Sequence, residues 1–262
     1  IRTGARVKKI TRDGMNVSGV ELADGEQIAA SAVVSKTDLR TTIEDLLGYR
    51  EVEAGFARRV SHVRSDGNAA KLHIALDGLP SFNGLTEEQL AQRLLIAPSL
   101  EYVELAFNHC KYGEHSVKPV FEITLPSLSD PSLAPSGKHV LSAVVQYAPR
   151  HLKQGWSEGK AGFIDICMDT LAEYAPDIRD HVSSVELLTP EDLEAMHGST
   201  GGHWHHGEMC LDQFLMLRPV AHGAQYRMPV DGLFLCGAGT HPGGGVMGSA
   251  GRNAANAVLA GQ

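Results

Sequence analysis

The residue types best suited to chemistry lie near the end of the chain, where glycines are closely spaced. We call residues 237–248 the glycine segment. Glycine lets the main chain approach a ligand closely, and the start of a helix offers unpaired N–H groups to negative charge. This pattern favours a site for an anion or one end of a nucleotide over a tight loop without a ligand. The glycines are Gly237, Gly239, Gly243, Gly244, Gly245 and Gly248.

The sequence on either side of the glycine segment predicts the elements that hold it. Leu233–Cys236 is a short apolar run, typical of a buried strand. Residues Ser249–Leu259 are rich in alanine and contain no proline, which is helix composition. The segment from Asp231 to Leu259 is therefore predicted to be a strand, a glycine-rich turn and the start of a helix.

A second group of candidate ligands precedes the glycine segment. Imidazole and thiolate groups suit zinc, so a metal site is one hypothesis. The histidine spacing matches no usual zinc pattern, and we favour a loop whose histidines line a domain junction, without a metal. The group is His197, His203, His205, His206, Glu208 and Cys210.

Four other residues have two open interpretations each. His241 either flanks a ligand or sits on a rigid turn beside Pro242. Arg218 either positions the chain before the last strand or forms a surface salt bridge. Trp156, like Trp204, suits a cavity wall or a core. No serine or cysteine lies in a nucleophile-elbow context, so the sequence does not support hydrolase chemistry.

The elements before the candidate site change in character along the chain. Residues 6–34 predict a β-meander that ends in a strand buried on both faces, and 37–47 predict a helix. Residues 58–77 and 100–147 alternate like antiparallel strands, interrupted by a loop at 126–137.

Three further helices are predicted from their starts and their periodicity. Thr86 begins a capping box ahead of Leu90, Leu94 and Leu95. Phe163, Cys167, Leu171 and Tyr174 recur at helical spacing, and Thr189 with Pro190 marks another helix start. The order of strands, mixed insert and final strand–turn–helix is typical of a nucleotide-binding domain interrupted by a second domain.

Composition excludes several classes of function. The formal net charge is -8 without a basic cluster, so a nucleic-acid partner is not expected. No apolar run approaches the ~18 residues that span a bilayer. Four separated cysteines predict reduced thiols and an intracellular protein, in a bacterial cytoplasm or a mitochondrion.

The run GAGTHPGGGVMG, followed by RNAA, resembles the C-terminal FAD motif of phytoene desaturase-like oxidoreductases. The resemblance is strongest to the branch called pyridine nucleotide-disulfide oxidoreductase domain proteins. Residues 6–35 and 189–219 are also similar to that family, whereas about 50–185 are similar in general layout. The resemblance implies FAD as cofactor and transfer of a hydride from a C–H bond of a small, apolar substrate to the flavin.

The same resemblance assigns roles to individual residues. It implies that the main chain at Val7 meets the adenine, and that His206 orients substrate or handles a proton. It places the flavin against the glycine segment, with helix-start N–H groups near its pyrimidine edge. The implied cofactor contacts in that segment are Gly237, Ala238, Gly239, Gly245, Val246 and Met247.

The sequence departs from the family pattern in two places. A first G-x-G-x-x-G motif is absent, and Ala238 occupies the position where many relatives carry an acid. We therefore expect the chain to be the C-terminal portion of a longer oxidoreductase, to bind FAD weakly by itself and to be inactive as an isolated fragment. A non-catalytic binding or assembly module on the same scaffold is the alternative.

The predicted fold is a partial α/β FAD/NAD(P)-binding domain with an inserted α+β antiparallel-sheet substrate domain. Residues 1–49 and 216–262 are assigned to the FAD-binding domain, and 50–215 to the substrate domain. The identity of the substrate, the electron acceptor and the oligomeric state, including a homodimer, stay open at this point.

Overall fold

The computed structural model describes residues 1–261, which form two compact units. Of the described residues, the first contains 1–66 and 197–261, and the second contains 67–196. The sequence placed the boundaries at 49/50 and 215/216. In the structure the first boundary follows residue 66, and the second precedes residue 197. The first boundary is later because Phe56, Val60 and Val63 pack into the same core as Ile43 and Leu47.

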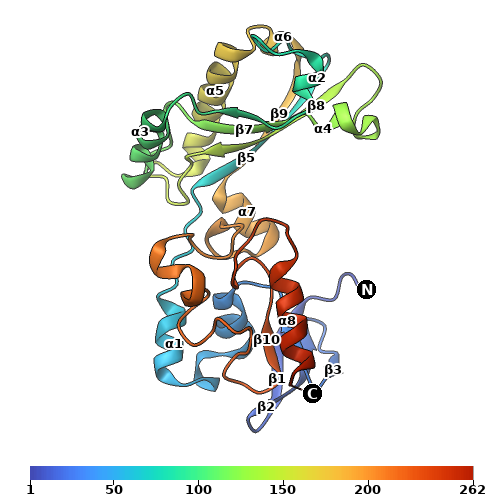
Figure 1. The fold of residues 1–262 in the computed structure, drawn as a ribbon, viewed down its shortest axis with the longest axis vertical. Coiled ribbons are helices and arrows are strands. Elements are labelled where there is room, and N and C mark those ends of the chain that lie inside the picture. The colour runs from blue at the N-terminus through green and yellow to red at the C-terminus, as the bar shows by residue number, and fades with distance from the viewer. Residues whose placement is uncertain (262) are drawn as a thin grey trace. The chain divides into compact units, whose positions relative to one another are not determined.

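The first unit combines a β-meander with the strand–turn–helix that holds the glycine segment (Figure 1). Its last strand and last helix have the bounds that the sequence predicted, to within one residue. The elements are β1 (Val7–Asp13), β2 (Asn16–Leu22), β3 (Gln27–Ala29), β4 (Val33–Ser35), η1 (Thr41–Leu47), η2 (Tyr49–Glu51), α1 (Ala54–Ser61), η4 (Thr200–Gly202), η5 (Leu211–Gln213), η6 (Leu215–Leu217), β10 (Leu233–Leu235) and α8 (Ser249–Leu259).

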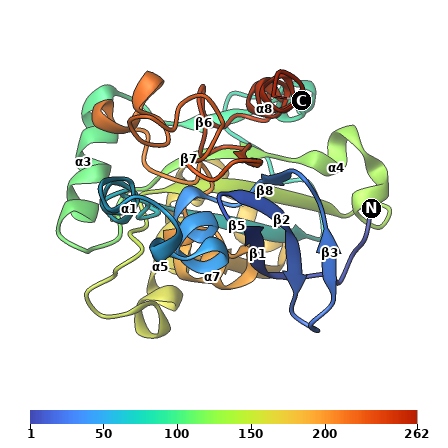
Figure 2. The same cartoon turned by 90° about the horizontal axis from the view of Figure 1, so that it is seen from below.

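Two small sheets organise this unit. Strands β1, β2 and β3 pair antiparallel in that order and lie side by side in Figure 2. Strand β10 pairs parallel with β4, with Leu235 opposite Ser35. Asp231, two residues before β10, also joins the meander, since Val17 N donates to Asp231 O at 2.8 Å. These pairings fix the point at which the glycine segment leaves the sheet.

Strand β4 is less buried than the sequence predicted. Its parallel pairing with β10 is present, but Val34 is 47% exposed, and Ser35 rather than a valine is the buried residue. A strand with one hydrogen-bonded neighbour has less cover than a central strand. The prediction of burial on both faces is therefore wrong for Val34.

The second unit is a five-stranded antiparallel sheet with helices, and α5 packs against the sheet through a shared apolar core (Figure 1). The strand order is β6-β7-β8-β5-β9. The elements are β5 (Ala69–Leu76), α2 (Glu87–Leu90), β6 (Leu94–Ile96), α3 (Leu100–Lys111), β7 (Val120–Thr124), α4 (Pro126–Ser129), η3 (Pro131–Leu133), β8 (His139–Gln146), α5 (Trp156–Tyr174), α6 (Ile178–His181), β9 (Val182–Leu188) and α7 (Pro190–His197).

Three local predictions are wrong, each for an identifiable reason. Residues 100–111 form helix α3 and not a strand, because Ser99 caps it by accepting from Tyr102 N at 3.1 Å. Residues 58–61 belong to α1, which Glu53 caps. The helix predicted through Leu95 is one turn long, although its capping box is present, because Leu94–Ile96 pair with β7.

The helices predicted at 163–174 and from Pro190 are present as α5 and α7. Trp156 at the start of α5 is buried and donates to Pro149 O at 2.9 Å, so it serves the core of the second unit. No helix within the described residues is long and apolar enough to cross a membrane.

Candidate functional site

The glycine segment emerges from a fully buried strand and ends at a helix start. All three residues of β10 are buried, and Gly248 precedes α8 with a φ of 70°. That left-handed conformation is one that glycine adopts without a steric penalty. No side chain caps α8, so its first N–H groups have no side-chain acceptor. The predicted strand, turn and helix start are confirmed as local structure.

The middle of the glycine segment lies directly against two histidines. A Cβ atom on Gly244 would lie 2.4 Å from Nδ1 of His205. A Cβ atom on Gly239 would lie 3.1 Å from Cβ of His206. The absence of side chains at these two glycines is therefore what lets the segment approach the histidines.

We call residues 203–213 the histidine segment. Its three histidines are held in the neutral form, because burial lowers the pKa of each. For His203 the pKa falls to about 4. Its Nδ1 accepts from the main-chain N–H of His205 at 3.2 Å, which places the ring proton of neutral His203 on Nε2.

His206 has features of a functional residue. Its φ is 57°, and its Nδ1 atom is buried without a hydrogen-bond partner among the described residues. Burial lowers its pKa, and the charge of Asp38 opposes that shift. Such a neutral, unsatisfied imidazole nitrogen can accept a proton or a hydrogen bond from a ligand.

Arg218 is a structural residue of this site that the sequence left undecided. It is 2% exposed and is among the largest fully buried side chains. The interpretation as a surface salt bridge is wrong, because its partners are main-chain carbonyls, and burial lowers its pKa. No sequence signal distinguishes such a buried arginine from a surface one. The carbonyls belong to His205, Gly207, Glu208, Gln213 and Ala238.

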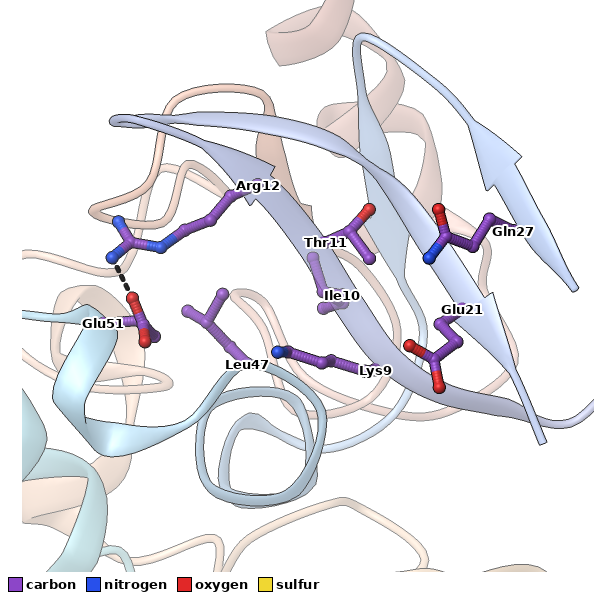
Figure 3. Close-up of a pocket in the computed structure, with 8 residues that line it drawn as sticks. All are labelled: Lys9, Ile10, Thr11, Arg12, Glu21, Gln27, Leu47 and Glu51. Atoms are coloured by element: carbon purple, nitrogen blue, oxygen red, sulfur yellow. Dashed lines mark ion pairs between the residues drawn. The ribbon is translucent and has the colours of Figure 1, made fainter. Parts of the chain in front are cut away.

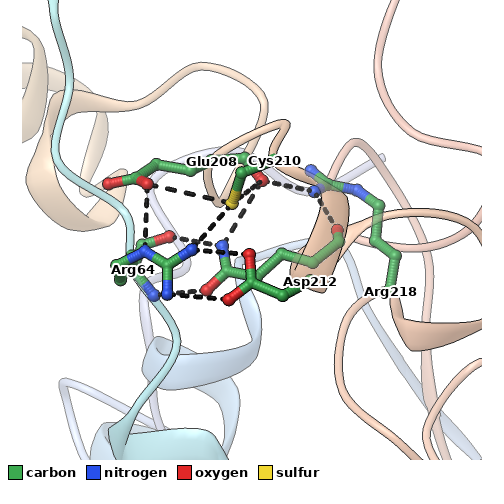
Figure 4. Close-up of polar contacts among 6 residues, drawn as sticks. Arg64, Glu208, Cys210, Asp212 and Arg218 are labelled. Carbon is green, nitrogen blue, oxygen red and sulfur yellow. Dashed lines mark hydrogen bonds and ion pairs between the residues drawn. The ribbon is translucent and has the colours of Figure 1, made fainter.

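A second arginine holds the histidine segment from its exposed side (Figure 4). The guanidinium of Arg64 bonds Asp212 at 2.7 and 3.0 Å, Glu208 at 3.2 Å and Cys210 Sγ at 2.9 Å. Arg64 lowers the pKa of Asp212 to about 2. The side-chain amide of Gln213 also accepts from Arg64 N at 2.8 Å and donates to Arg64 O at 3.0 Å. Glu208 and Cys210, which the sequence suggested as metal ligands, thus help Arg64 to hold the histidine segment in place.

The metal hypothesis concerns side chains in the part of the chain that the structure describes. No three His, Cys, Asp or Glu side chains there are grouped so that they could hold a metal ion. His241, the histidine within the glycine segment, bonds Leu215 O through Nδ1 at 3.2 Å. Its main-chain carbonyl accepts from the hydroxyl of Tyr226 at 2.6 Å. His241 therefore ties the segment to η6 and to Tyr226.

The other predicted contact residues differ in their exposure. Val246 and Met247 are exposed, and Val246 has a φ of 60°, which is rare for a β-branched residue. Ala238 is part of the scaffold, since its carbonyl accepts from Arg218. Val7 lies in the meander, where it pairs with Leu22. The structure thus joins His206 to Gly239 and leaves the end of the glycine segment open.

A pocket of about 260 Å³ lies on the first unit, over β1, β2 and η1 (Figure 3). Its lining is mostly polar, and an ion pair between Arg12 and Glu51 crosses its rim. It is smaller than the ~300–1,000 Å³ of usual ligand pockets and lacks their apolar walls. The lining residues are Lys9, Ile10, Thr11, Arg12, Glu21, Gln27, Leu47 and Glu51.

Comparisons with known proteins agree with this geometry. The model of the family described as flavin containing amine oxidoreductase matches residues 1–259. The chain is 38% identical to pyridine nucleotide-disulfide oxidoreductase domain-containing protein 2 of Rattus norvegicus, over 98% of this chain and 46% of that protein. It is 29% identical to a lycopene-forming phytoene desaturase of Paracoccus sp., over 97% of this chain and 49% of that protein.

A solved structure supports the fold. An oxidoreductase from Methanosarcina mazei superimposes with a TM-score of 0.56 at 16% identity, covering 98% of this chain and 48% of that one. The architecture is that of an FAD/NAD(P)-binding fold with an antiparallel-sheet part, as the sequence predicted. The chain belongs to the flavin containing amine oxidoreductase family, so the predicted resemblance is confirmed. It spans about half the length of the curated relatives it matches.

Proposed function

We propose that this chain forms the flavin end of an FAD-dependent oxidoreductase that removes a hydride from a C–H bond of a small, apolar substrate. The observation that carries the proposal is the glycine segment, which is fixed against His205 and His206 on one side and exposed from Gly245 to Gly248. Family membership supports a flavin cofactor. Bound FAD would supply the hydride acceptor, as flavins do.

The residues present fit the flavin end of that cofactor. Gly248 leaves open space, since nothing lies within 4 Å of an added Cβ atom, and at Gly245 an added Cβ atom would meet only the end of the exposed Met247 side chain, at 3.1 Å. The uncapped N–H groups at the start of α8, together with those near Val246 and Met247, favour negative charge through the helix dipole. The proposed cofactor contacts remain Val7, Gly237, Ala238, Gly239, Gly245, Val246 and Met247.

His206 is the proposed residue for orienting substrate or for handling a proton. Its lowered pKa keeps it neutral at physiological pH, and its unpaired Nδ1 is free to accept. An apolar substrate is supported by the phytoene desaturase relative and by the exposed apolar side chains of Val246 and Met247. Val246, Met247 and His206 would together form an apolar wall of the substrate site that carries one hydrogen-bond acceptor.

The test uses the full-length protein that contains this chain. The purified protein is mixed anaerobically with apolar candidates that carry an oxidisable C–H bond, including polyprenoids, other lipids and amines. Loss of the oxidised flavin absorbance with an apolar substrate is the expected result. A bound flavin that no substrate of any class reduces, although dithionite does, would contradict the proposed reaction.

The role of His206 has a separate test. In His206→Asn the imidazole is replaced by an amide that tolerates the positive φ of this position and keeps an acceptor but cannot take up a proton. We expect a fall of at least tenfold in kcat with unchanged FAD content. The exposed His222 provides the control substitution, His222→Asn. Wild-type kcat in His206→Asn would exclude proton handling by His206.

A further inference from the structure

The side chain of Arg218 uses all of its donor nitrogens on main-chain oxygens. Nε and Nη2 donate to Ala238 O at 3.2 and 2.9 Å. Nη1 donates to Glu208 O and Gln213 O, both at 3.3 Å. Nη2 also donates to Gly207 O at 3.3 Å and to His205 O.

These oxygens belong to two different segments. Ala238 stands at the beginning of the glycine segment, whereas the other four acceptors lie in the histidine segment. One planar guanidinium therefore joins residues 205–213 to residue 238, two stretches that are distant in sequence. Its five N–H groups point in fixed directions, so the segments are held in one relative position.

The joined position determines the contacts at the candidate site. His205, whose carbonyl Arg218 binds, is the residue whose ring meets Gly244. The next residue, His206, meets Gly239. Gly243 is also close, because a Cβ atom there would lie 3.8 Å from Nε of Arg218. The guanidinium thus lies behind the surface that the glycine segment presents.

The arrangement is costly as a way to fill a core. Burying a cation is unfavourable, and an apolar side chain of similar volume stabilises a fold as well or better. Fixed geometry is what a guanidinium provides and an apolar side chain lacks. Every donor nitrogen of Arg218 has a carbonyl partner, and these hydrogen bonds offset part of the free-energy cost of burying the guanidinium.

We propose that Arg218 is a positioning residue of the flavin site, which fixes the glycine segment against the histidine segment before the cofactor binds. The part of this inference that concerns FAD rests on the proposed function. Loss of the guanidinium would release both segments together and leave the second unit unchanged. A lysine at this position would not replace the arginine, because its single ammonium group cannot reach all of the carbonyls that the guanidinium contacts.

The experiment compares three variants of the full-length protein. Arg218→Lys keeps the charge, and Arg218→Met keeps the apolar stem. Arg227→Met is the matched control, because Arg227 of the same unit donates to Ala257 O at 2.6 Å and lies over the ring of Phe234. Amide hydrogen exchange is measured on the cofactor-free proteins, and FAD affinity and flavin circular dichroism on the reconstituted ones.

Both Arg218 variants are expected to exchange at least tenfold faster than wild type in residues 203–217 and 236–247, with residues 67–196 unchanged. Their dissociation constant for FAD should rise at least tenfold, which is about 1.4 kcal/mol. The visible circular dichroism of any flavin retained should change, because that signal reports the flavin's surroundings. Arg227→Met should match wild type in all three measurements.

Three results would overturn the inference. Wild-type exchange in Arg218→Lys would show that charge suffices without the fork. Faster exchange throughout the protein would show a general loss of stability, and faster exchange in one segment alone would show that the two are not joined. A wild-type protein that binds no FAD overturns the proposed function instead, and the exchange data still decide whether Arg218 joins the segments.

Discussion

Gly244 is the residue of the glycine segment at which an added Cβ atom would make the shortest contact. An added Cβ atom would lie 2.4 Å from the ring nitrogen of His205 and 3.3 Å from Cβ of Ala238. We expect Gly244→Ala to displace the segment and to weaken FAD binding at least tenfold in the full-length protein. Equilibrium titration with FAD measures the effect.

Gly251 in α8 provides the matched control, since nothing lies within 4 Å of an added Cβ atom there. Gly251→Ala should leave FAD binding unchanged and raise stability by up to about 1 kcal/mol, as alanine favours a helix interior. Equal FAD affinity in Gly244→Ala and Gly251→Ala would mean that the contact with His205 does not shape the site.

The histidine segment should make the protein sensitive to acid. Burial lowers the pKa of His203 to about 4, against 6.5 for the unfolded chain. Between these values the unfolded chain binds one more proton, so the free energy of unfolding falls as the pH drops from 6.5 towards 4. The loss from His203 is about 2 kcal/mol between pH 6.5 and 4.5.

Denaturant unfolding at the two pH values tests this expectation. His203→Asn keeps an acceptor for the His205 N–H and removes the titration, so its stability should change less with pH. His222→Asn, at an exposed position, should behave as wild type. An unchanged pH dependence in His203→Asn would show that this imidazole is not the responsible group.

At the scale of single residues, the sequence singled out the glycines and His206, whose functional roles stay predictions, and it could not indicate the use of Arg218. Glycine spacing is visible in a sequence because it reflects main-chain geometry that other residues cannot adopt. The role of an arginine depends on which carbonyls surround it, and those come from residues 205–213 and 238. The assigned role of Val7, like those of the other proposed cofactor contacts, also stays a prediction.

At the scale of elements, a buried carboxylate joins the first helical segment to a distant turn. Asp38 is 2% exposed and accepts from Thr41 N at 3.0 Å, Thr41 Oγ1 at 2.8 Å and Thr200 Oγ1 at 2.9 Å. Asp38→Ala would leave these donors unsatisfied. We expect the free energy of unfolding to fall by about 2–4 kcal/mol in a denaturant titration.

The exposed carboxylate of Asp13, in β1, provides the comparison. Asp13→Ala should change stability by less than about 0.5 kcal/mol. If both variants lose the same stability, the link between Asp38 and the turn at Thr200 is not a special feature of the first unit.

Element prediction succeeded where local signals agreed with tertiary pairing. The meander, β10 and α8 have strong turn or composition signals, and the structure contains them. The alternation of apolar and polar residues predicted a strand at 100–111, but a serine cap and packing on one face produce helix α3 there. The helix predicted through Leu95 is wrong for a different reason: Leu94–Ile96 pair with β7, and this pairing outweighs helix propensity. Such long-range partners are invisible in a single sequence.

At the scale of the whole molecule, the order of elements indicated the fold class better than it placed the boundaries. A unit built from both ends of the chain, with an antiparallel insert, is present. The first unit extends to residue 66 because α1 contributes to its core, and it resumes at 197 because the histidine segment is bonded to Arg64 and Arg218. These contacts have no periodic signature.

The central claim is that the glycine segment holds the flavin end of FAD. Its most direct test is the amount of flavin that the purified full-length protein retains after gel filtration, measured by absorbance once the protein is denatured. The account predicts about one FAD per chain for wild type and for Gly251→Ala, and a much lower content for Gly244→Ala. No retained or titratable FAD in the wild-type protein would contradict it.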